Sequence, residues 1–287
     1  MRILGDYFLF HRKRPFLASY KLTYWCNLSC RQCPFKSYHS PQPSYAQVCR
    51  TLDDLHTRGS QVVIFEGGEP LLWRDGKYTC RDVIDYARQK FFRVGITTNG
   101  TLPLDLEADV VWVSLDGLEK THNRLRGAPI FARVVENIRQ SRHMRIYAHI
   151  TANAENYAEI PALVHFISPL VKGITVQFYY PYEGEEQLFL PWADRSSLLD
   201  ELIALKNAGY PILNSVPALN ALKNNSWGCL SWLVDNANPD GSLFQGCYLQ
   251  GRSEIDCSKC GFSPYTEISL AFRGDPRAIL AGMKIFY

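Results

Sequence analysis

Short runs rich in β-branched and aromatic residues alternate with amphipathic helical stretches through the first two-thirds of the sequence. Strands are predicted over 19–25, 61–65, 93–97, 110–114, 145–151 and 174–179, and helices over 45–57, 80–90, 130–139 and 157–168. Strands joined by helical crossovers run parallel. Six such units fall short of the closed eight-unit barrel, which takes about 250 residues. The sequence therefore predicts an α/β fold with an open, partial (β/α)6 TIM-like barrel.

The pattern changes in the last third of the chain. One more helix is predicted over 195–207, after which the sequence becomes rich in Gly, Pro, Asn and Ser and four cysteines follow. We expect a small, irregular, cysteine-rich C-terminal domain. The expected division is an N-terminal extension over 1–16, the partial barrel over 17–192, and a helix with the cysteine-rich domain over 193–287.

Composition narrows the class of protein. Apolar residues make up 46% and charged residues 21% of the 287, which is typical of globular proteins. No apolar run approaches the roughly 20 residues that span a bilayer, and the first residues lack the features of a secretory signal. A chain of this length needs no disulfides, so nine cysteines in clusters fit a reducing cytoplasm. A net charge of +3 gives no indication of nucleic-acid binding.

Three of the cysteines, Cys26, Cys30 and Cys33, follow the first predicted strand. Their spacing lets one loop place three thiolates around one face of an iron–sulfur cluster. A 4Fe-4S cluster normally takes four cysteines, so three leave one iron open to another ligand. A structural zinc site is the alternative, and His39 would be its candidate fourth ligand.

Polar motifs follow the next three predicted strands. They are Gly-Gly-Glu-Pro at 67–70, Thr-Asn-Gly at 98–100 and Ser-Leu-Asp-Gly at 114–117. The carboxyl ends of parallel strands are where such folds place their sites, and paired glycines let a backbone approach a ligand closely. Asn-Gly and Asp-Gly are also common turn formers, which is the alternative explanation.

Taken in order, the cysteine loop and these three motifs resemble the radical S-adenosylmethionine (SAM) superfamily over roughly residues 19–182. The resemblance implies that Cys26, Cys30 and Cys33 hold a 4Fe-4S cluster whose open iron chelates the amino and carboxylate groups of SAM. It further implies reductive cleavage of SAM to a 5′-deoxyadenosyl radical, with a low-potential electron donor such as flavodoxin or ferredoxin.

The same resemblance implies a set of SAM-binding residues. Those expected at the methionyl amino group are Gly67, Gly68 and Glu69, and those expected at the ribose hydroxyls and methionyl carboxylate are Thr98, Asn99, Ser114 and Asp116. Arg126 matches a recurrent stretch after the fourth strand. It either pairs with the methionyl carboxylate or is a solvated surface charge.

The C-terminal cysteines Cys229, Cys247, Cys257 and Cys260 form a second set. A Cys-x2-Cys knuckle serves zinc or iron–sulfur sites, and a hairpin over 239–247 would return Cys247 towards it. Spacing alone favours structural zinc. The layout resembles the twitch domain, the shortened form of the SPASM domain, and this resemblance implies a second 4Fe-4S cluster.

The substrate is the least determined part of the sequence. Tyr182 and Glu183 lie beyond the last predicted strand and are candidate catalytic residues. Hydrogen abstraction by an oxidoreductase or epimerase is the first expectation. The second is addition of the adenosyl radical to a lipid or other alkene, since residues 7–14, the cysteine loop and 180–184 distantly resemble adenosylhopene-forming enzymes. A small molecule, a lipid or a peptide remains open as substrate.

Two further alternatives concern function and surface. A metal-stabilised binding protein without turnover is the rival to an enzyme. The apolar residues 7–10 beside the basic residues 11–14 could contact an anionic membrane surface, or could form a solvated edge segment.

Overall fold

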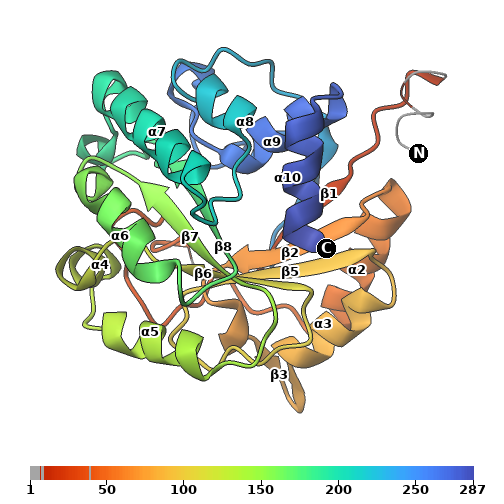
Figure 1. The fold of residues 1–287 in the computed structure, drawn as a ribbon. Coiled ribbons are helices and arrows are strands. Elements are labelled where there is room, and N and C mark those ends of the chain that lie inside the picture. Colours follow the sequence, from red (N-terminus) through yellow and green to blue (C-terminus); the bar gives the residue numbers. More distant parts are fainter. Residues whose placement is uncertain (1–6, 8–9, 39) are drawn as a thin grey trace.

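The computed structural model describes residues 7, 10–38 and 40–287, so His39 and part of the 7–10 segment lie outside the described residues. One eight-stranded sheet runs through the molecule in the order β10-β9-β1-β2-β5-β6-β7-β8 (Figure 1). Its strands are β1 (Leu17–Thr23), β2 (Val62–Gly67), β5 (Arg93–Thr98), β6 (Val110–Ser114), β7 (Ile146–Ala152), β8 (Gly173–Phe178), β9 (Val234–Ala237) and β10 (Leu243–Gln245). The six predicted strands, β1, β2, β5, β6, β7 and β8, run parallel in this sheet and form an open barrel.

Helices cover the outside of the barrel (Figure 1). They are α2 (Tyr45–Arg58), α3 (Cys80–Arg88), α4 (Glu119–Arg126), α5 (Phe131–Gln140), α6 (Ile160–Ile167) and α7 (Trp192–Asn207), with a small hairpin of β3 (Arg74–Asp75) and β4 (Tyr78–Thr79). The sequence did not predict α4, because its eight residues are almost all polar and only Thr121, His122 and Leu125 are buried. All the other helices of this group were predicted, to within a few residues.

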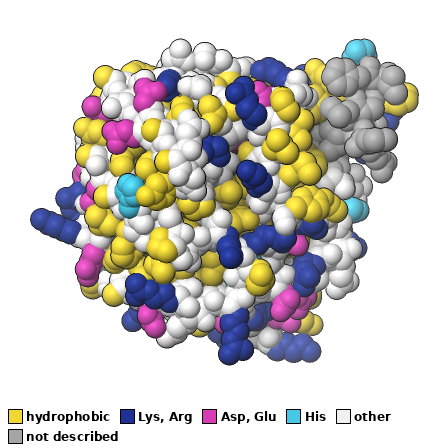
Figure 2. All heavy atoms as spheres, viewed as in Figure 1, with side chains coloured by type: hydrophobic (Ala, Val, Ile, Leu, Met, Phe, Trp, Pro, Cys, Tyr) yellow, Lys and Arg dark blue, Asp and Glu magenta, His cyan; other side chains and the backbone are white. Residues whose placement is uncertain are grey.

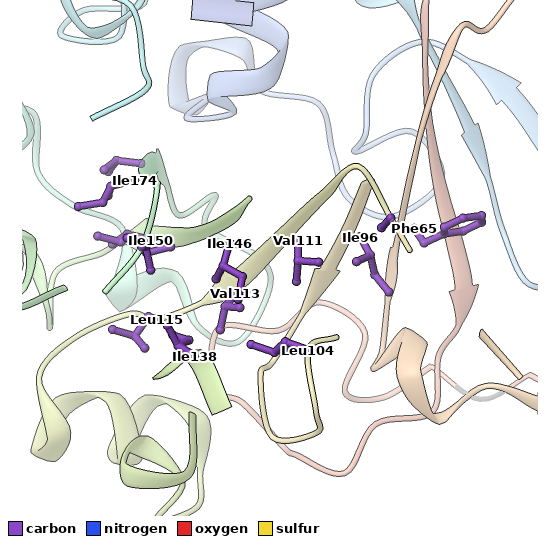
Figure 3. Packing of buried hydrophobic residues seen from close by; sticks show 14 of the residues in the cluster. Phe65, Ile96, Leu104, Val111, Val113, Leu115, Ile138, Ile146, Ile150 and Ile174 are labelled. Carbon is purple, nitrogen blue, oxygen red and sulfur yellow. The ribbon is translucent and has the colours of Figure 1, made fainter. Parts of the chain in front are cut away.

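Alternate strand residues point outward into a continuous apolar core. Members of this core shown in Figure 3 include Phe65, Ile96, Val111, Val113, Ile150 and Ile174 from the strands and Ile138 from α5. Side chains of a strand alternate between its two faces, so the residues between them face the interior of the barrel.

The interior of the barrel has an apolar end and a polar end. At the amino ends of the strands, Trp112 and Tyr147 pack with Leu213 against the last residues of α10 (Pro276–Phe286), and the Tyr147 hydroxyl donates to the Ile285 carbonyl over 2.8 Å. At the carboxyl ends, the inward-facing residues are Lys21, Glu66, Thr97, Ser114, His149 and Gln177. The interior is therefore closed at one end and polar at the other.

The C-terminal part extends the same sheet. Strand β9 pairs parallel with β1, and β10 pairs antiparallel with β9, which confirms the predicted hairpin. This part is more regular than the sequence suggested, because it also contains α8 (Val216–Ala221), α9 (Ser263–Phe272) and α10. Helix α10 was not predicted; it buries the small residues Ala278 and Ala281 and leaves Leu280 and Met283 about half exposed.

Figure 2 shows hydrophobic and basic side chains mixed over the face that carries α10. No helix in the described part of the chain is long and apolar enough to cross a membrane.

Candidate active site at the carboxyl ends of the strands

The loop after β1 places three thiols beside separate hydrogen-bond donors. Cys30 is buried, Cys33 is half-buried and Cys26 is exposed. Their sulfur atoms accept from the side-chain amide of Asn99 (3.8 Å, Cys26), from Arg126 NH1 (3.9 Å, Cys30) and from the Phe35 amide (3.4 Å, Cys33). Donors on the sulfurs stabilise thiolates and tune iron–sulfur clusters.

Electrostatics within this loop disfavour free thiolates. Burial, together with the thiols of Cys30 and Cys26, raises the pKa of Cys33 to about 11. Thiolates gathered in this way repel one another until a cation offsets their charge. The donor set and its electrostatics therefore fit an iron–sulfur cluster held by three cysteines.

The two glycines of the Gly-Gly-Glu-Pro motif allow the end of β2 to lie close to the backbone at the end of β1 and just after it. A Cβ on Gly67 would clash with the Thr23 carbonyl oxygen, and one on Gly68 would clash with the Trp25 carbonyl oxygen. The Gly68 amide donates to Thr23 over 2.7 Å, and the next amide donates to Trp25 over 2.7 Å. The structural reason for these glycines is thus close approach to the backbone just before Cys26, whereas the sequence suggested close approach to a ligand.

Glu69 ties the end of β2 to the end of β5. Its side chain is fully buried and accepts from the Thr98 hydroxyl (2.7 Å), the Asn99 amide (2.7 Å) and the Leu71 amide (3.1 Å). Burial raises the pKa of Glu69, and these hydrogen bonds oppose the rise. Its carboxylate oxygens are engaged inside the protein, so Glu69 orients Thr98 and Asn99. A direct contact of Glu69 with SAM stays a prediction.

Asn99 links this network to the cysteine loop. Its side-chain nitrogen donates to Asn27 over 2.8 Å, next to Cys26, and its side-chain oxygen accepts from the amide and hydroxyl of Thr101. The contact with the Thr101 amide is that of an Asx turn, whereas the contact with Asn27 bridges two loops, which a turn role alone does not explain.

Asp116 and Arg126 form a buried ion pair. Asp116 is inaccessible to solvent and accepts from Arg126 NH2 (2.6 Å), the Gln32 side-chain amide (2.6 Å) and the Thr151 amide (3.0 Å). Only 12% of the Arg126 side chain is exposed, so the alternative of a solvated surface charge is wrong. Burial alone would lower the pKa of Arg126, but Asp116 and Cys30 raise it.

One atom of Arg126 remains unsatisfied. Its Nε is buried and has no hydrogen-bond partner within the described residues. Buried donors are almost always paired, so this orphaned Nε is a candidate donor to a bound group. The expected pairing with the methionyl carboxylate fits this geometry and stays a prediction.

The two candidate catalytic residues lie along one cavity of about 1020 Å³. Tyr182 is half-buried and packs edge-on against Tyr179 and Tyr180, whereas Glu183 is exposed; both line the cavity. Ser114 is half-buried at the end of β6, on the polar interior of the barrel, and is not among the residues lining this cavity.

The four C-terminal cysteines come from separate segments into one region. Burial and the thiols of Cys247 and Cys257 raise the pKa of Cys260 to about 11. Burial and the thiols of Cys260, Cys247 and Cys257 likewise raise the pKa of Cys229. Buried Arg195 donates to the Cys260 carbonyl over 3.0 Å and so braces the knuckle. Across the described residues, no three His, Cys, Asp or Glu side chains converge as ligands of a single metal ion.

Two charged residues of the barrel interior were missed at the level of sequence. Lys21 is fully buried and donates to Ser19 Oγ (2.6 Å) and Asn236 Oδ1 (2.9 Å), and its Nζ lies 3.2 Å from Glu66. Burial lowers the pKa of Lys21 to about 7, against the attraction of Glu66. The sequence signal that could have identified them was a charged residue within each of two largely apolar strands, β1 and β2.

His149 is a third missed residue. It lies on β7, half-buried on the inner face, and its Nδ1 is 2.9 Å from the Thr175 hydroxyl. Burial lowers its pKa to about 4, so the ring is neutral at physiological pH.

Comparison with known proteins agrees with this geometry. A sequence model of the radical SAM superfamily matches residues 20–167. Fe-coproporphyrin III synthase of Methanosarcina barkeri is 31% identical over 170 residues, covering 53% of this chain and 40% of that protein. The subtilosin biosynthesis protein AlbA of Bacillus subtilis is 32% identical over 127 residues, covering 39% of this chain and 27% of that protein. The chain thus spans less than half the length of both curated relatives.

Solved structures share the fold over nearly the whole chain. SuiB of Streptococcus suis bound to S-adenosylmethionine superposes with a TM-score of 0.68 at 15% identity, covering 95% of this chain and 68% of that chain. The enzyme anSMEcpe with bound AdoMet gives 0.63 at 16% identity, covering 94% and 84%.

Because the family match spans more than half of its residues, the chain belongs to the radical SAM superfamily. Members of this superfamily are enzymes, and the curated relatives include synthases. The alternative of a binding protein without turnover is therefore wrong.

Proposed function

We propose that this enzyme abstracts a hydrogen atom from a small molecule bound between its two cysteine sets. The observation that carries the proposal is the cavity of about 1020 Å³, because it is lined by Cys33 of the first set and Cys257 of the second. Membership of the superfamily implies SAM and a 4Fe-4S cluster. When reduced, this pair supplies a 5′-deoxyadenosyl radical, for which a low-potential flavodoxin or ferredoxin is the proposed electron source.

Each part of the site has a proposed role. Cys26, Cys30 and Cys33 hold the cluster, and Gly67 and Gly68 present backbone carbonyls to the methionyl amino group. Thr98, Asn99, Ser114 and Asp116 bind the ribose and the methionyl carboxylate, with Glu69 as the internal brace. The unpaired Nε of Arg126 is proposed to donate to the methionyl carboxylate. Tyr182 and Glu183 contact the substrate, and bound substrate and SAM would exclude water from the radical.

The second set, Cys229, Cys247, Cys257 and Cys260, is proposed to hold an auxiliary 4Fe-4S cluster as in a twitch domain. Support comes from the four thiols of three segments being near enough for three of them to raise the pKa of Cys229, and from the position of Cys257 on the cavity. A site with four cysteine ligands would favour electron transfer over direct substrate binding.

A small-molecule substrate is favoured by the size of the cavity. Pockets for small ligands measure roughly 300–1,000 Å³, and this one lies at the upper end. Relatives are named as Fe-coproporphyrin III and heme synthases, whereas SuiB has been solved bound to its precursor peptide SuiA. A peptide is therefore the competing outcome.

Anaerobic reconstitution tests the core of the proposal. Protein loaded with iron and sulfide, then given dithionite and SAM, should release 5′-deoxyadenosine and methionine. Cys30→Ala should abolish this release, whereas Cys257→Ala should spare the spectroscopic signal of the first cluster and remove about half of the bound iron. If wild-type protein with an intact first cluster forms no 5′-deoxyadenosine, the assignment fails.

The type of reaction is read from the product. Metabolite extracts from cells with and without the gene, incubated with the loaded enzyme, are compared by mass spectrometry. Hydrogen abstraction releases 5′-deoxyadenosine, whereas radical addition to an alkene leaves adenosine covalently on the product. Adenosylated product would replace the present proposal by the transferase alternative.

A further inference from the structure

Two cavities meet at Arg252. The larger one, of about 1020 Å³, runs from Cys33 to Cys257, and the second, of about 510 Å³, is lined by residues such as Tyr24 and Phe244. Of the residues that the structure describes, only Tyr38 and Arg252 line both cavities. The guanidinium group therefore stands where a ligand in the larger cavity would reach towards the smaller one.

Aromatic rings and neutral acceptors hold Arg252 in place. Its guanidinium carbon lies 4.6 Å from the centre of the Tyr248 ring and 5.5 Å and 5.6 Å from the rings of Phe35 and Phe244. NH2 donates to Asn238 Oδ1 over 2.7 Å, and NH1 donates to the Tyr248 carbonyl. These contacts fix the orientation of the group, and both acceptors are neutral.

Every other cation of the larger cavity that lies near a cysteine set has an acidic partner. Arg31 pairs with Glu155 (2.6 Å) and Glu185 (3.3 Å), and Lys36 pairs with Glu185 (3.2 Å). Lys259 pairs with Asp256 over 3.3 Å. Over the described ranges, no carboxylate oxygen lies within 4.0 Å of a nitrogen of Arg252.

The nearest acid of the smaller cavity is engaged elsewhere. Asp240 lines that cavity, and its carboxylate accepts from the amide (2.9 Å) and hydroxyl (2.6 Å) of Ser242. The charge of Arg252 also reaches the barrel interior: after burial and the opposing effect of Glu66, it contributes to the lowered pKa of Lys21. Among the described residues, Arg252 is thus a cation without a carboxylate partner, between the substrate cavity and the polar barrel interior.

We propose that Arg252 anchors an oxyanion of the substrate, a carboxylate or a phosphate, at the junction of the two cavities. A planar guanidinium with fixed orientation binds such groups through two parallel hydrogen bonds, and the aromatic rings around Arg252 hold that orientation. The inference rests on the proposed function insofar as it treats the larger cavity as the substrate site. It narrows the substrate class to anions.

Binding of three matched probes to the reconstituted holoenzyme tests this inference. Benzoate, phenyl phosphate and uncharged benzamide share one ring, and their dissociation constants are measured by calorimetry with SAM saturating, so that the SAM carboxylate occupies its own site. At least one anion should bind, and benzamide should bind at least tenfold more weakly. Preference for benzoate identifies a carboxylate substrate, and preference for phenyl phosphate identifies a phosphate.

Single-residue variants test whether the anionic probe binds at Arg252. Arg252→Gln should weaken binding of the preferred anion at least tenfold, and Arg252→Lys should weaken it less because the charge remains. Lys36→Met removes a cation of the same cavity that is already paired and should leave the affinity unchanged. Equal binding of anion and amide, equal affinity in wild type and Arg252→Gln, or a loss in Lys36→Met as large as in Arg252→Gln would overturn the inference.

Two controls distinguish failure of the Arg252 inference from misfolding of a variant and from failure of the proposed function. If Arg252→Gln does not fold, as judged by its unfolding transition, Arg252→Lys still decides, since unchanged anion affinity would then contradict a planar two-bond contact. Formation of 5′-deoxyadenosine by wild-type enzyme is measured on the same sample. Cleavage without anion binding refutes the Arg252 anchor, and anion binding without cleavage refutes the proposed function.

Discussion

Arg126 donates from NH2 to the carboxylate of Asp116 over 2.6 Å, in a pair from which solvent is almost entirely excluded. NH1 of the same guanidinium points to the Cys30 sulfur, 3.9 Å away. Asp116 thereby holds a positive charge next to a cysteine proposed to carry negative charge. The pair couples the end of β6 to the cysteine loop after β1.

Arg126→Met should destabilise the protein strongly, because it leaves Asp116 charged, buried and unpaired. Removal of one partner of a buried ion pair costs about 3–5 kcal/mol. Urea unfolding measures the loss, and the double variant with Asp116→Asn should recover part of it. Arg88→Met is the control, since Arg88 and Glu107 form an exposed pair whose loss costs under about 1 kcal/mol. Similar losses in both single variants would contradict this account.

Gly68→Ala should displace the cysteine loop, because the added Cβ meets the Trp25 carbonyl oxygen. Iron bound after reconstitution should fall to about the level of Cys30→Ala. The matched control is Gly282→Ala in α10, where a Cβ meets nothing within 4 Å and a helical glycine is replaced. That change should stabilise the protein by roughly 0.5–1 kcal/mol. Full iron loading of Gly68→Ala would show that a side chain is tolerated where Gly68 approaches the Trp25 carbonyl.

Glu69→Gln should weaken the site by turning one acceptor into a donor. Three donors meet the carboxylate, so the amide nitrogen of glutamine would face one of them. The expected cost is about 1–3 kcal/mol in unfolding free energy, with a lower affinity for SAM. Glu107→Gln, at an exposed position, should change neither quantity. Unaltered SAM affinity in Glu69→Gln would exclude the proposed bracing of Thr98 and Asn99.

Glu267 should make stability depend on pH. Burial raises its pKa from 4.5 to about 7, and its Oε2 is buried without a partner in the described structure. A raised folded-state pKa means that its stabilising contribution is complete below about pH 4.5 and is lost as pH rises through about 7. The loss amounts to about 3 kcal/mol, since one pKa unit corresponds to roughly 1.4 kcal/mol.

Urea unfolding at pH 5 and pH 8 measures this effect in wild type and Glu267→Gln. The variant cannot ionise, so its advantage over wild type should grow from pH 5 to pH 8. Asp200→Asn, an exposed control, should show no such trend. Parallel pH profiles of wild type and Glu267→Gln would mean that another group carries the dependence.

The sequence by itself determined the partial barrel and the edge of that barrel at which the candidate site residues lie. Alternation of strand and helix indicated six parallel units, and parallel units bring the carboxyl ends of their strands to one edge. Residues directly after those strands, such as Cys30, Glu69 and Asp116, were therefore placed together without coordinates. The signal is local, because strand period and motif spacing are properties of short segments.

Only the tertiary structure decided which partners these residues have. Lys21 and Asn236 are 215 positions apart and meet because β9 pairs with β1. Arg252 has no distinguishing neighbours in sequence, and its role follows from where two cavities meet. Likewise, Arg126 could be a surface charge or a buried partner of Asp116 until its exposure was known. Burial and pairing across distant segments depend on how the whole chain packs, so local patterns cannot determine them.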